Sequence, residues 1–446
     1  MAALTPTAGM AGMARSGLAG LAGAAVGAGA QFLMVVLVTR GTGRQTAGAF
    51  FAATALCLTV GGILRMDAGN GLIHVIARAG ASGHERVRGY VRAALVPVAA
   101  LSLAAGATVF LGVPDPTFRV LGAALPVMVC ADVMVAATRG FGAMLPTVLL
   151  EGVLQPVAQL VLVTVSMLAG VRSGPVLAAA WALPYLPVLV LATVWLRGRL
   201  PRAPHPPDAP RAAGALAQDV TTTLDAARDL WRHTWPRSAA AAIQAVFQRL
   251  DVVAVAVLAG PAEAAVYTAA TRFKVVGQLA GQGLARAAQP RLVDALTTRD
   301  LRRARELYQS ATVWLVLLTW PIWLAYAALA PWLLGVFGEG YAAGAPVALV
   351  LAITMMIATA CGMVDVVLTA AGHTGSSLAN LVAAVAVTVA LGASLIPSSG
   401  ALGAALGWAG GTLVKNLLPL WQIHRRYGLR PFGAHSLAAL TSWRSG

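Results

Sequence analysis

Twelve long runs of apolar residues follow one another along the 446-residue chain. Each is close to the roughly 20 residues that a helix needs to cross a bilayer, and none shows the alternation of a membrane β-barrel strand. We therefore expect an all-α integral membrane protein, because helices satisfy their own backbone polar groups in lipid. The spans are expected at 18–39, 47–66, 91–112, 118–138, 146–169, 175–196, 236–258, 264–287, 310–333, 344–366, 375–396 and 400–421.

Composition agrees with the pattern, since 58% of the residues are hydrophobic and only 11% are charged. A soluble domain carries about a quarter charged residues, so a soluble or disordered chain is excluded. The three cysteines lie far apart in apolar runs, which is typical of small interior residues. The first run has no A-x-A site before a polar stretch, so we expect it to be a retained signal-anchor.

The basic residues of the connecting segments predict the orientation. With a cytoplasmic N-terminus, 23 of the 32 Lys and Arg residues fall on the inside and four on the outside. This asymmetry follows the positive-inside rule and predicts that both termini are cytoplasmic. The net charge of +16 then reflects topology and contact with anionic membrane lipid, and nucleic acid is not an expected partner.

A polar stretch divides the spans six and six. Residues 197–211 are Pro-rich and predict an extended linker, whereas the apolar positions that follow recur at helical spacing and predict an amphipathic helix on the cytoplasmic membrane face. The predicted parts are an N-terminal six-helix bundle (1–196), the linker with its interfacial helix (197–235), a C-terminal six-helix bundle (236–421) and a cytoplasmic tail (422–446).

The two bundles resemble each other in sequence. Gln31 to Thr54 aligns without a gap with Gln248 to Thr271, and GNGL at 69–72 matches GQGL at 281–284. An even number of spans in each half gives both repeats the same orientation, related by an axis along the membrane normal. Parallel repeats of this kind are typical of transporters with a substrate cavity.

Polar side chains form one stripe on each of several spans. A charged group at bilayer depth costs at least ~2.5–3.5 kcal/mol, so each needs a partner or water. A single Gln or Thr is explained equally well by a hydrogen bond between helices, but several stripes together indicate a shared wet cavity. The stripes and isolated acids comprise Gln155, Gln159, Glu151, Gln244, Gln248, Asp251, Gln278, Gln282, Asp132 and Asp365.

Three cations, Arg249, Arg272 and Lys274, lie too deep in their predicted spans to reach the membrane surface. They either pair with Asp132, Glu151, Asp251 or Asp365, or face an anion such as a diphosphate, whose oxygens match the donor fork of arginine. Arg65 and Lys415 lie near span ends and are expected to extend to the surface.

Catalytic motifs are missing from the sequence: it has no GxSxG, no HExxH and no Walker loop, and no two of its histidines have metal-ligand spacing. We therefore expect neither an enzyme nor a cofactor or metal. Without an ATP site, energy must come from an ion gradient, the membrane potential or consumption of the substrate.

Three segments resemble the polysaccharide-biosynthesis (O-antigen-type) flippases of the multidrug/oligosaccharidyl-lipid/polysaccharide (MOP) exporter superfamily. They are RLDVVAVAVLAGPAEAAVYTAATR (249–272), LLGVFGEGYAAGAPVALVLA (333–352) and AAGHTGSSLAN (370–380). The resemblance implies a MATE-like V of two bundles in the bacterial cytoplasmic membrane. It also implies movement of undecaprenyl-diphosphate-linked glycans to the outer leaflet, with glycosyltransferases or a polymerase of the same pathway as further candidate partners.

For such a substrate we assign the diphosphate to Arg249, Arg272 and Lys274. The sugars and cavity are assigned to the glutamines, and ion coupling or ion pairing is assigned to the acids. The lists are Gln155, Gln159, Gln244, Gln248, Gln278 and Gln282 for the glutamines, and Asp132, Glu151, Asp251 and Asp365 for the acids.

Three alternatives stay open. A lipid II flippase of the same superfamily usually has two further C-terminal spans, whereas a polar tail follows residue 421 here. A cation-coupled multidrug exporter usually has an acid in its first span, and this first span has none. A membrane enzyme of glycan assembly would need a large outer loop or a catalytic histidine.

Overall fold

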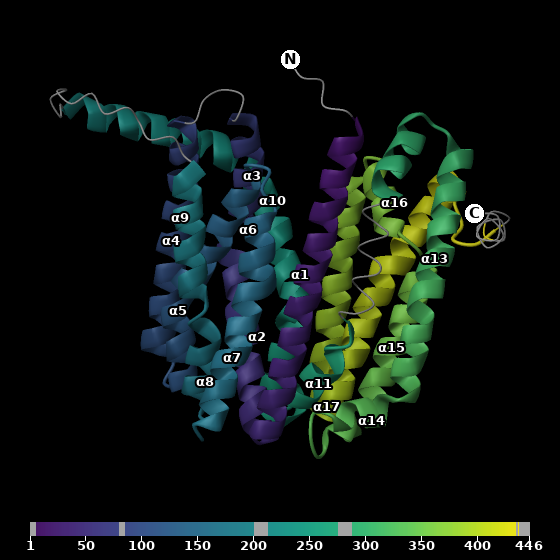
Figure 1. The fold of residues 1–446 in the computed structure, drawn as a ribbon. Helices are drawn as coiled ribbons and strands as arrows, with labels where there is room; N and C mark the ends of the chain where they lie inside the picture. Colours follow the sequence, from purple (N-terminus) through teal and green to yellow (C-terminus); the bar gives the residue numbers. More distant parts are fainter. Residues whose placement is uncertain (1–5, 80–84, 200–212, 275–287, 434–435, 437–446) are drawn as a thin grey trace. The chain divides into compact units, whose positions relative to one another are not determined.

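The computed structural model describes residues 6–79, 85–199, 213–274, 288–433 and 436, and these residues form helices and connecting turns with no strand among them (Figure 1). The all-α membrane fold expected from the sequence is therefore confirmed. The chain divides into two compact units. Unit 1 comprises Met1–Thr42 and Ala53–Leu250, and unit 2 comprises Gly43–Ala52 and Asp251–Gly446. The expected V shape and domain limits stay predictions.

In unit 1 the helix α5 packs against α3, α4, α8 and α9. It begins at Pro116, where proline suits the first helical position, and the Asp115 carboxylate accepts a hydrogen bond of 2.7 Å from the Thr117 amide. The helices of unit 1 are α1 (Pro6–Gly41), the part of α2 (Arg44–Leu64) that follows Ala52, α3 (Ala68–Ala79), α4 (Glu85–Gly112), α5 (Pro116–Arg139), α6 (Leu145–Thr147), the π-helix η1 (Val148–Leu154), α7 (Gln155–Leu168), α8 (Gly174–Ala182), α9 (Tyr185–Arg199) and most of α10 (Ala213–Leu258).

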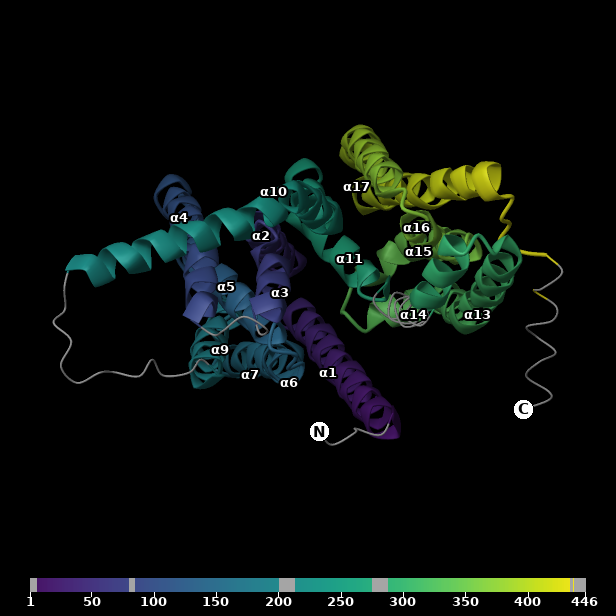
Figure 2. The same ribbon diagram turned by 90° about the horizontal axis from the view of Figure 1, so that it is seen from above.

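The predicted interfacial helix and span seven form one continuous helix, α10. Its first part lies across the other helices of unit 1 and its second part runs along them, as both ribbon views show (Figures 1 and 2). The first part is fixed to the bundle, because the Trp231 indole donates to the Ala93 carbonyl at 3.0 Å and Asp229 accepts from Arg78 and from the Tyr90 hydroxyl.

Unit 2 is built around a buried cluster that includes Leu292, Tyr308, Val364 and Ile423, drawn from four segments of the chain. The Tyr308 hydroxyl donates to the Cys361 carbonyl at 2.5 Å inside this cluster. The labelled elements of unit 2 are α11 (Pro261–Thr271), α13 (Leu301–Ala328), α14 (Ala330–Gly335), the 3-10 helix η2 (Tyr341–Gly344), α15 (Ala345–Ala360), α16 (Val364–Ala370) and α17 (Thr374–Tyr427).

The element α17 is a hairpin of two antiparallel helices. Its helical geometry is broken at Gly400, whose φ of 53° and ψ of −128° suit glycine. Asn380 and Gln422 exchange two side-chain hydrogen bonds of 2.9 Å across the hairpin. A Cβ on Gly411 would lie 1.8 Å from the Thr388 hydroxyl, so the two helices approach through glycine. The hairpin corresponds to the predicted spans 375–396 and 400–421.

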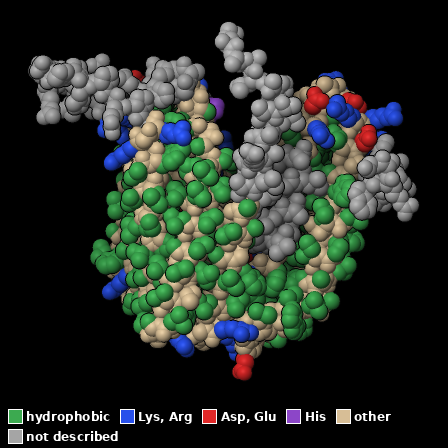
Figure 3. All heavy atoms as spheres, viewed as in Figure 1, with side chains coloured by type: hydrophobic (Ala, Val, Ile, Leu, Met, Phe, Trp, Pro, Cys, Tyr) green, Lys and Arg blue, Asp and Glu red, His purple; other side chains and the backbone are tan. Residues whose placement is uncertain are grey.

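Ten helical segments of the described residues are long and apolar enough to cross a membrane, and α17 counts as one of them. The predicted span 264–287 falls partly outside the described residues. The count of twelve therefore stays a prediction. The visible faces of both units carry hydrophobic side chains over their middle, while charged side chains gather toward the ends (Figure 3). Large exposed side chains such as Leu111, Leu168 and Val257 suit contact with lipid.

The sequence repeat coincides with the breaks between helices. α1 ends at Gly41 and α2 begins at Arg44, whereas α10 ends at Leu258 and α11 begins at Pro261. These are equivalent positions of the ungapped alignment. The same local chain reversal is thus encoded in both halves, which supports the parallel pseudo-repeat.

Replacing Gly411 with alanine should destabilise the hairpin. The added methyl group has no room beside Thr388 and Ala384, and forced overpacking costs about 1–3 kcal/mol. We expect a lower thermal unfolding temperature in detergent. Gly375 lies on the same element with nothing within 4 Å of its added Cβ. A Gly375→Ala control should therefore keep or raise the unfolding temperature, and an equal loss in both variants would contradict the hairpin packing.

Candidate functional site

A charged cluster lies inside unit 1, where α2 ends against α5. The Arg65 Nη1 atom lies 3.1 Å from Asp132 Oδ2, and both side chains keep some exposure, 46% and 30%. Arg65 was expected to extend to the membrane surface, and that expectation is wrong. It pairs with Asp132 because the acid, at bilayer depth, offers a partner of opposite charge within reach.

The turn that follows Arg65 is strained and held by α10. Met66 and Asp67 have φ of 46° and 53°, which side chains other than glycine rarely adopt. The Ser238 hydroxyl donates to the Met66 carbonyl at 2.5 Å, and Arg237 Nε lies 3.1 Å from Asp67 Oδ2. Contacts from α10 thus maintain the sharp turn that directs Arg65 toward α5.

Two more arginines act on the same acids. The charges of Arg249 and Arg139, like that of Arg65, interact with Asp132. Glu151 interacts electrostatically with Asp132, Arg139 and Arg65. The cluster therefore combines three arginines with two carboxylates, an excess of one positive charge when both acids are ionised.

Glu151 lies on the π-helix η1, a widened turn that the sequence analysis treated as regular α-helix. The Gln155 amide donates to the Leu150 carbonyl, five residues back, and Pro156 has no amide hydrogen to offer Gly152. A Cβ on Gly27 would lie 2.7 Å from the freed Gly152 carbonyl. Pro156 is the residue from which this π-turn could have been predicted. Turns of this kind often mark functional sites.

The glutamines of unit 1 differ in what they contact. Gln31 donates to the Gln159 side-chain oxygen at 2.7 Å, and Gln159 donates to the Trp181 carbonyl at 2.9 Å. Gln159 is buried, so its amide ties α1, α7 and α8 together. Gln155 is half-buried and contacts Tyr185 on α9. Their predicted contact with sugar stays a prediction.

Four other predicted glutamines lie on spans seven and eight. Gln244 is half-buried and Gln248 is exposed on α10, in the part that belongs to unit 1. Gln278 and Gln282 lie outside the described residues. The common face predicted for the polar residues of span seven stays a prediction, and part of the stripe of span eight lies outside the described residues.

The other deep cations belong to unit 2. Lys274 Nζ lies 3.8 Å from Asp251 Oδ2 and 4.3 Å from the centre of the Trp408 ring. Arg272 is half-buried and its charge interacts with that of Lys274. Tyr267 and Trp408 were not identified from the sequence, because an aromatic residue in an apolar run gives no sign that it faces a cation.

Two further acids of unit 2, Asp365 and Glu263, accept hydrogen bonds from α17. Asp365 is exposed on α16 and accepts a hydrogen bond of 2.5 Å from the Ser377 hydroxyl. Glu263 on α11 accepts from the Ala401 amide at 2.9 Å and so caps the second helix of the α17 hairpin.

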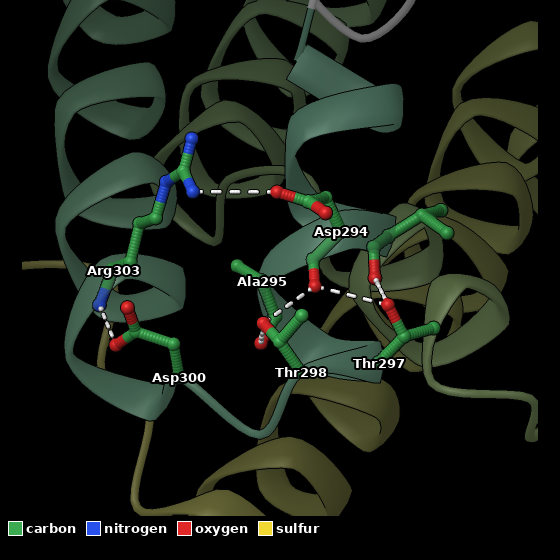
Figure 4. A network of polar contacts seen from close by, with 7 residues as sticks. Asp294, Ala295, Thr297, Thr298, Asp300 and Arg303 are labelled. Atoms are coloured by element: carbon green, nitrogen blue, oxygen red, sulfur yellow. Dashed lines mark hydrogen bonds and ion pairs between the residues drawn. The ribbon is translucent and has the colours of Figure 1, made fainter.

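An exposed network at the start of α13 is a capping structure (Figure 4). The Asp300 carboxylate accepts from the Arg303 amide at 3.0 Å, and Arg303 Nη1 lies 3.3 Å from Asp294 Oδ2. Both side chains of this ion pair are more than half exposed. Arg303 is therefore a suitable control for changes of the arginines in the charged cluster of unit 1. In the part of the chain that is described, no group of His, Cys, Asp or Glu residues could hold a metal ion.

The two acids of the unit 1 cluster should respond differently to neutralisation. Asp132→Asn removes the ion pair with Arg65 and should lower the free energy of unfolding by about 1–3 kcal/mol. Glu151→Gln should cost less, since Glu151 has no ion pair among the described residues. Thermal unfolding in detergent measures both, and an equal or larger loss for Glu151→Gln would contradict this account.

The arrangement of helices is similar to that of known transporters. No family model matches the chain, and no curated protein sequence matches it. A multidrug resistance MATE family transporter of the MOP superfamily in an inward-facing conformation is similar with a TM-score of 0.69 and 17% identity, over 90% of this chain and 94% of that one.

Two further solved structures have the same arrangement. The lipid II flippase MurJ in an inward closed conformation has a TM-score of 0.69 and 9% identity, over 96% of this chain and 91% of that one. A MOP superfamily transporter from Pyrococcus furiosus has a TM-score of 0.52 and 17% identity, over 92% and 93%. These relatives in structure are transporters and flippases, not enzymes. The chain therefore has the multi-pass membrane fold of the transporters of the MOP superfamily.

Proposed function

We propose that this protein is a flippase that moves a polyprenyl-diphosphate-linked oligosaccharide, a precursor of polysaccharide, from the inner to the outer leaflet by alternating access. The fold supports a transporter of the superfamily that includes both the MATE proteins and MurJ. The three resembling segments of the sequence support the glycan substrate. The distribution of Lys and Arg supports an orientation with both termini in the cytoplasm. The resemblance of the same three segments supports a location in the bacterial cytoplasmic membrane.

The observation that carries the proposal is the arginine-rich cluster of unit 1. A diphosphate needs several hydrogen-bond donors of positive charge, and Arg65, Arg139 and Arg249 offer planar donor forks that match phosphate oxygens. Asp132 neutralises Arg65 at 3.1 Å. A phosphate of the substrate would replace the Asp132 carboxylate as the partner of Arg65. Until the substrate binds, the carboxylate compensates the positive charge of the arginines within the membrane.

The membrane potential can drive such a step. Moving two negative charges outward across an inside-negative membrane gains about 4.6 kcal/mol per 100 mV, from ~2.3 kcal/mol per charge. A coupling ion at Asp132, Glu151 or Asp365 is therefore not required by the energetics. The diphosphate contact predicted for Arg272 in unit 2 stays a prediction, whereas Lys274 is 13% exposed and its Nζ atom lies 3.8 Å from Asp251 Oδ2.

A cation-coupled exporter is the second candidate. Glu151 favours it, because this acid lies on the π-helix next to Asp132 without an ion pair among the described residues. Such an acid suits binding of a proton or a cationic drug. The fold is equally compatible with this candidate and with a lipid II flippase.

The test is transport by purified protein in liposomes. A fluorescent polyprenyl-diphosphate glycan is supplied, and its leaflet is read from quenching by a reductant that does not cross the membrane. We expect Arg249→Gln to lower the flipping rate at least about tenfold, the effect of losing ~1.4 kcal/mol of interaction. The Arg303→Gln protein should flip the glycan lipid at the rate of the native protein, because the Arg303–Asp294 pair is exposed and distant in the sequence from the cluster.

Two results would contradict the proposal. One is Arg249→Gln protein that flips the glycan lipid as fast as the unchanged chain. The other is an unchanged chain that leaves the glycan lipid in place and transports a cationic drug, which would support the exporter.

A further inference from the structure

The Lys274 side chain is enclosed within unit 2, just after the end of α11. Its ammonium lies 3.8 Å from Asp251 Oδ2, 4.3 Å from the centre of the Trp408 ring and 5.9 Å from the centre of the Tyr267 ring. Only 13% of the Lys274 side chain and 7% of the Asp251 side chain are exposed. Three separate elements, α10, α11 and α17, supply the groups around this cation.

The acid of this enclosure is oriented by other contacts. The Tyr267 hydroxyl donates to Asp251 Oδ2 at 2.7 Å, and Asp251 Oδ1 accepts from the Val252 amide at 2.9 Å. Each carboxylate oxygen thus has a hydrogen bond that does not depend on Lys274. The Asp251 carboxylate would therefore keep its place if the lysine were removed.

The contact between Lys274 and Asp251 is longer than a direct hydrogen bond, for which the nitrogen and oxygen lie about 2.7–3.2 Å apart. The ammonium is held by charge and by the faces of two aromatic rings rather than by one fixed bond. A carboxylate, a phenol oxygen and ring faces together suit any small monovalent cation. Arg272 adds a like charge that disfavours a second cation beside Lys274.

We propose that Asp251, Tyr267 and Trp408 form a monovalent-cation site that the chain fills with its own Lys274 ammonium. No cation from solution binds there in the native protein. Asp251 therefore does not pass a coupling ion through unit 2, and removal of Lys274 opens the site to cations such as Na⁺. This inference concerns cation binding alone and does not rest on the proposed substrate.

The test compares thermal unfolding of purified chains in detergent at constant ionic strength, with NaCl, KCl or LiCl exchanged for choline chloride. The unfolding temperature of the native protein should be the same in each salt. Lys274→Met keeps the length of the side chain and removes its charge, and its unfolding temperature should rise with at least one small cation, saturably and by about 2 °C or more.

Two controls locate the effect. Lys274→Arg keeps the site filled and should show no response to the cations. Adding Asp251→Asn to Lys274→Met should abolish the response, because the acid that binds the cation is lost.

Several outcomes would overturn the proposal. One is a saturable cation response of the native protein that Asp251→Asn removes, since the site would then bind cations despite Lys274. Another is folded Lys274→Met protein that responds to none of the three cations. If Lys274→Met and Lys274→Gln fold only with added cation, the proposal is supported, and if no cation recovers either variant, it is overturned. Since no transport is measured, the result is separate from the flipping assay.

Discussion

Charged side chains inside an apolar bundle must find a partner, because lipid offers them neither water nor counter-ions. This constraint determines where the polar groups of both units lie. In unit 1 Arg65 pairs with Asp132, and in unit 2 Lys274 pairs with Asp251. The Arg65–Asp132 pair joins helices that are far apart in the sequence, whereas the Lys274–Asp251 pair joins α10 to the segment just after α11, the next helix along the chain. In both units the contacts that neutralise charge also hold neighbouring segments together.

The two ion pairs differ in solvent exposure, and we propose different roles for them. Arg65 is 46% exposed and lies in a cluster with more arginines than acids, which suits an anion that comes and goes. Lys274 is 13% exposed and lies against Trp408 beside a single acid that two other groups already hold. The first cluster is proposed to bind substrate, and the second to hold a permanent internal cation.

The sequence was sufficient to predict the helical membrane fold, because helical spans need long apolar runs and such runs can be recognised from the residue types alone. It also predicted the repeat, whose helix breaks at Gly41 and Leu258 fall on equivalent positions. Partners in space were harder to predict. Arg65 was assigned to the membrane surface because its depth was judged from its own span alone, and the Asp132 contact depends on packing between helices.

Local backbone geometry and side-chain contacts were also not predicted from the sequence. The π-helix at Glu151 follows from Pro156 and Gly152, but regular periodicity was assumed for the whole span. Gln159 has the polarity of a cavity residue, and only the structure shows that its amide is used between helices. Aromatic residues such as Trp408 gave no signal, since their contact with a cation depends on the fold.

The central claim, outward movement of a diphosphate-linked glycan, is tested most directly in cells that lack the protein. Lipid-linked intermediates would be extracted and their leaflet determined by an impermeant probe. We expect polyprenyl-diphosphate glycan to accumulate in the cytoplasmic leaflet and surface polysaccharide to be lost, and we expect the native chain to reverse both effects. Normal polysaccharide together with greater sensitivity to cationic drugs would contradict it.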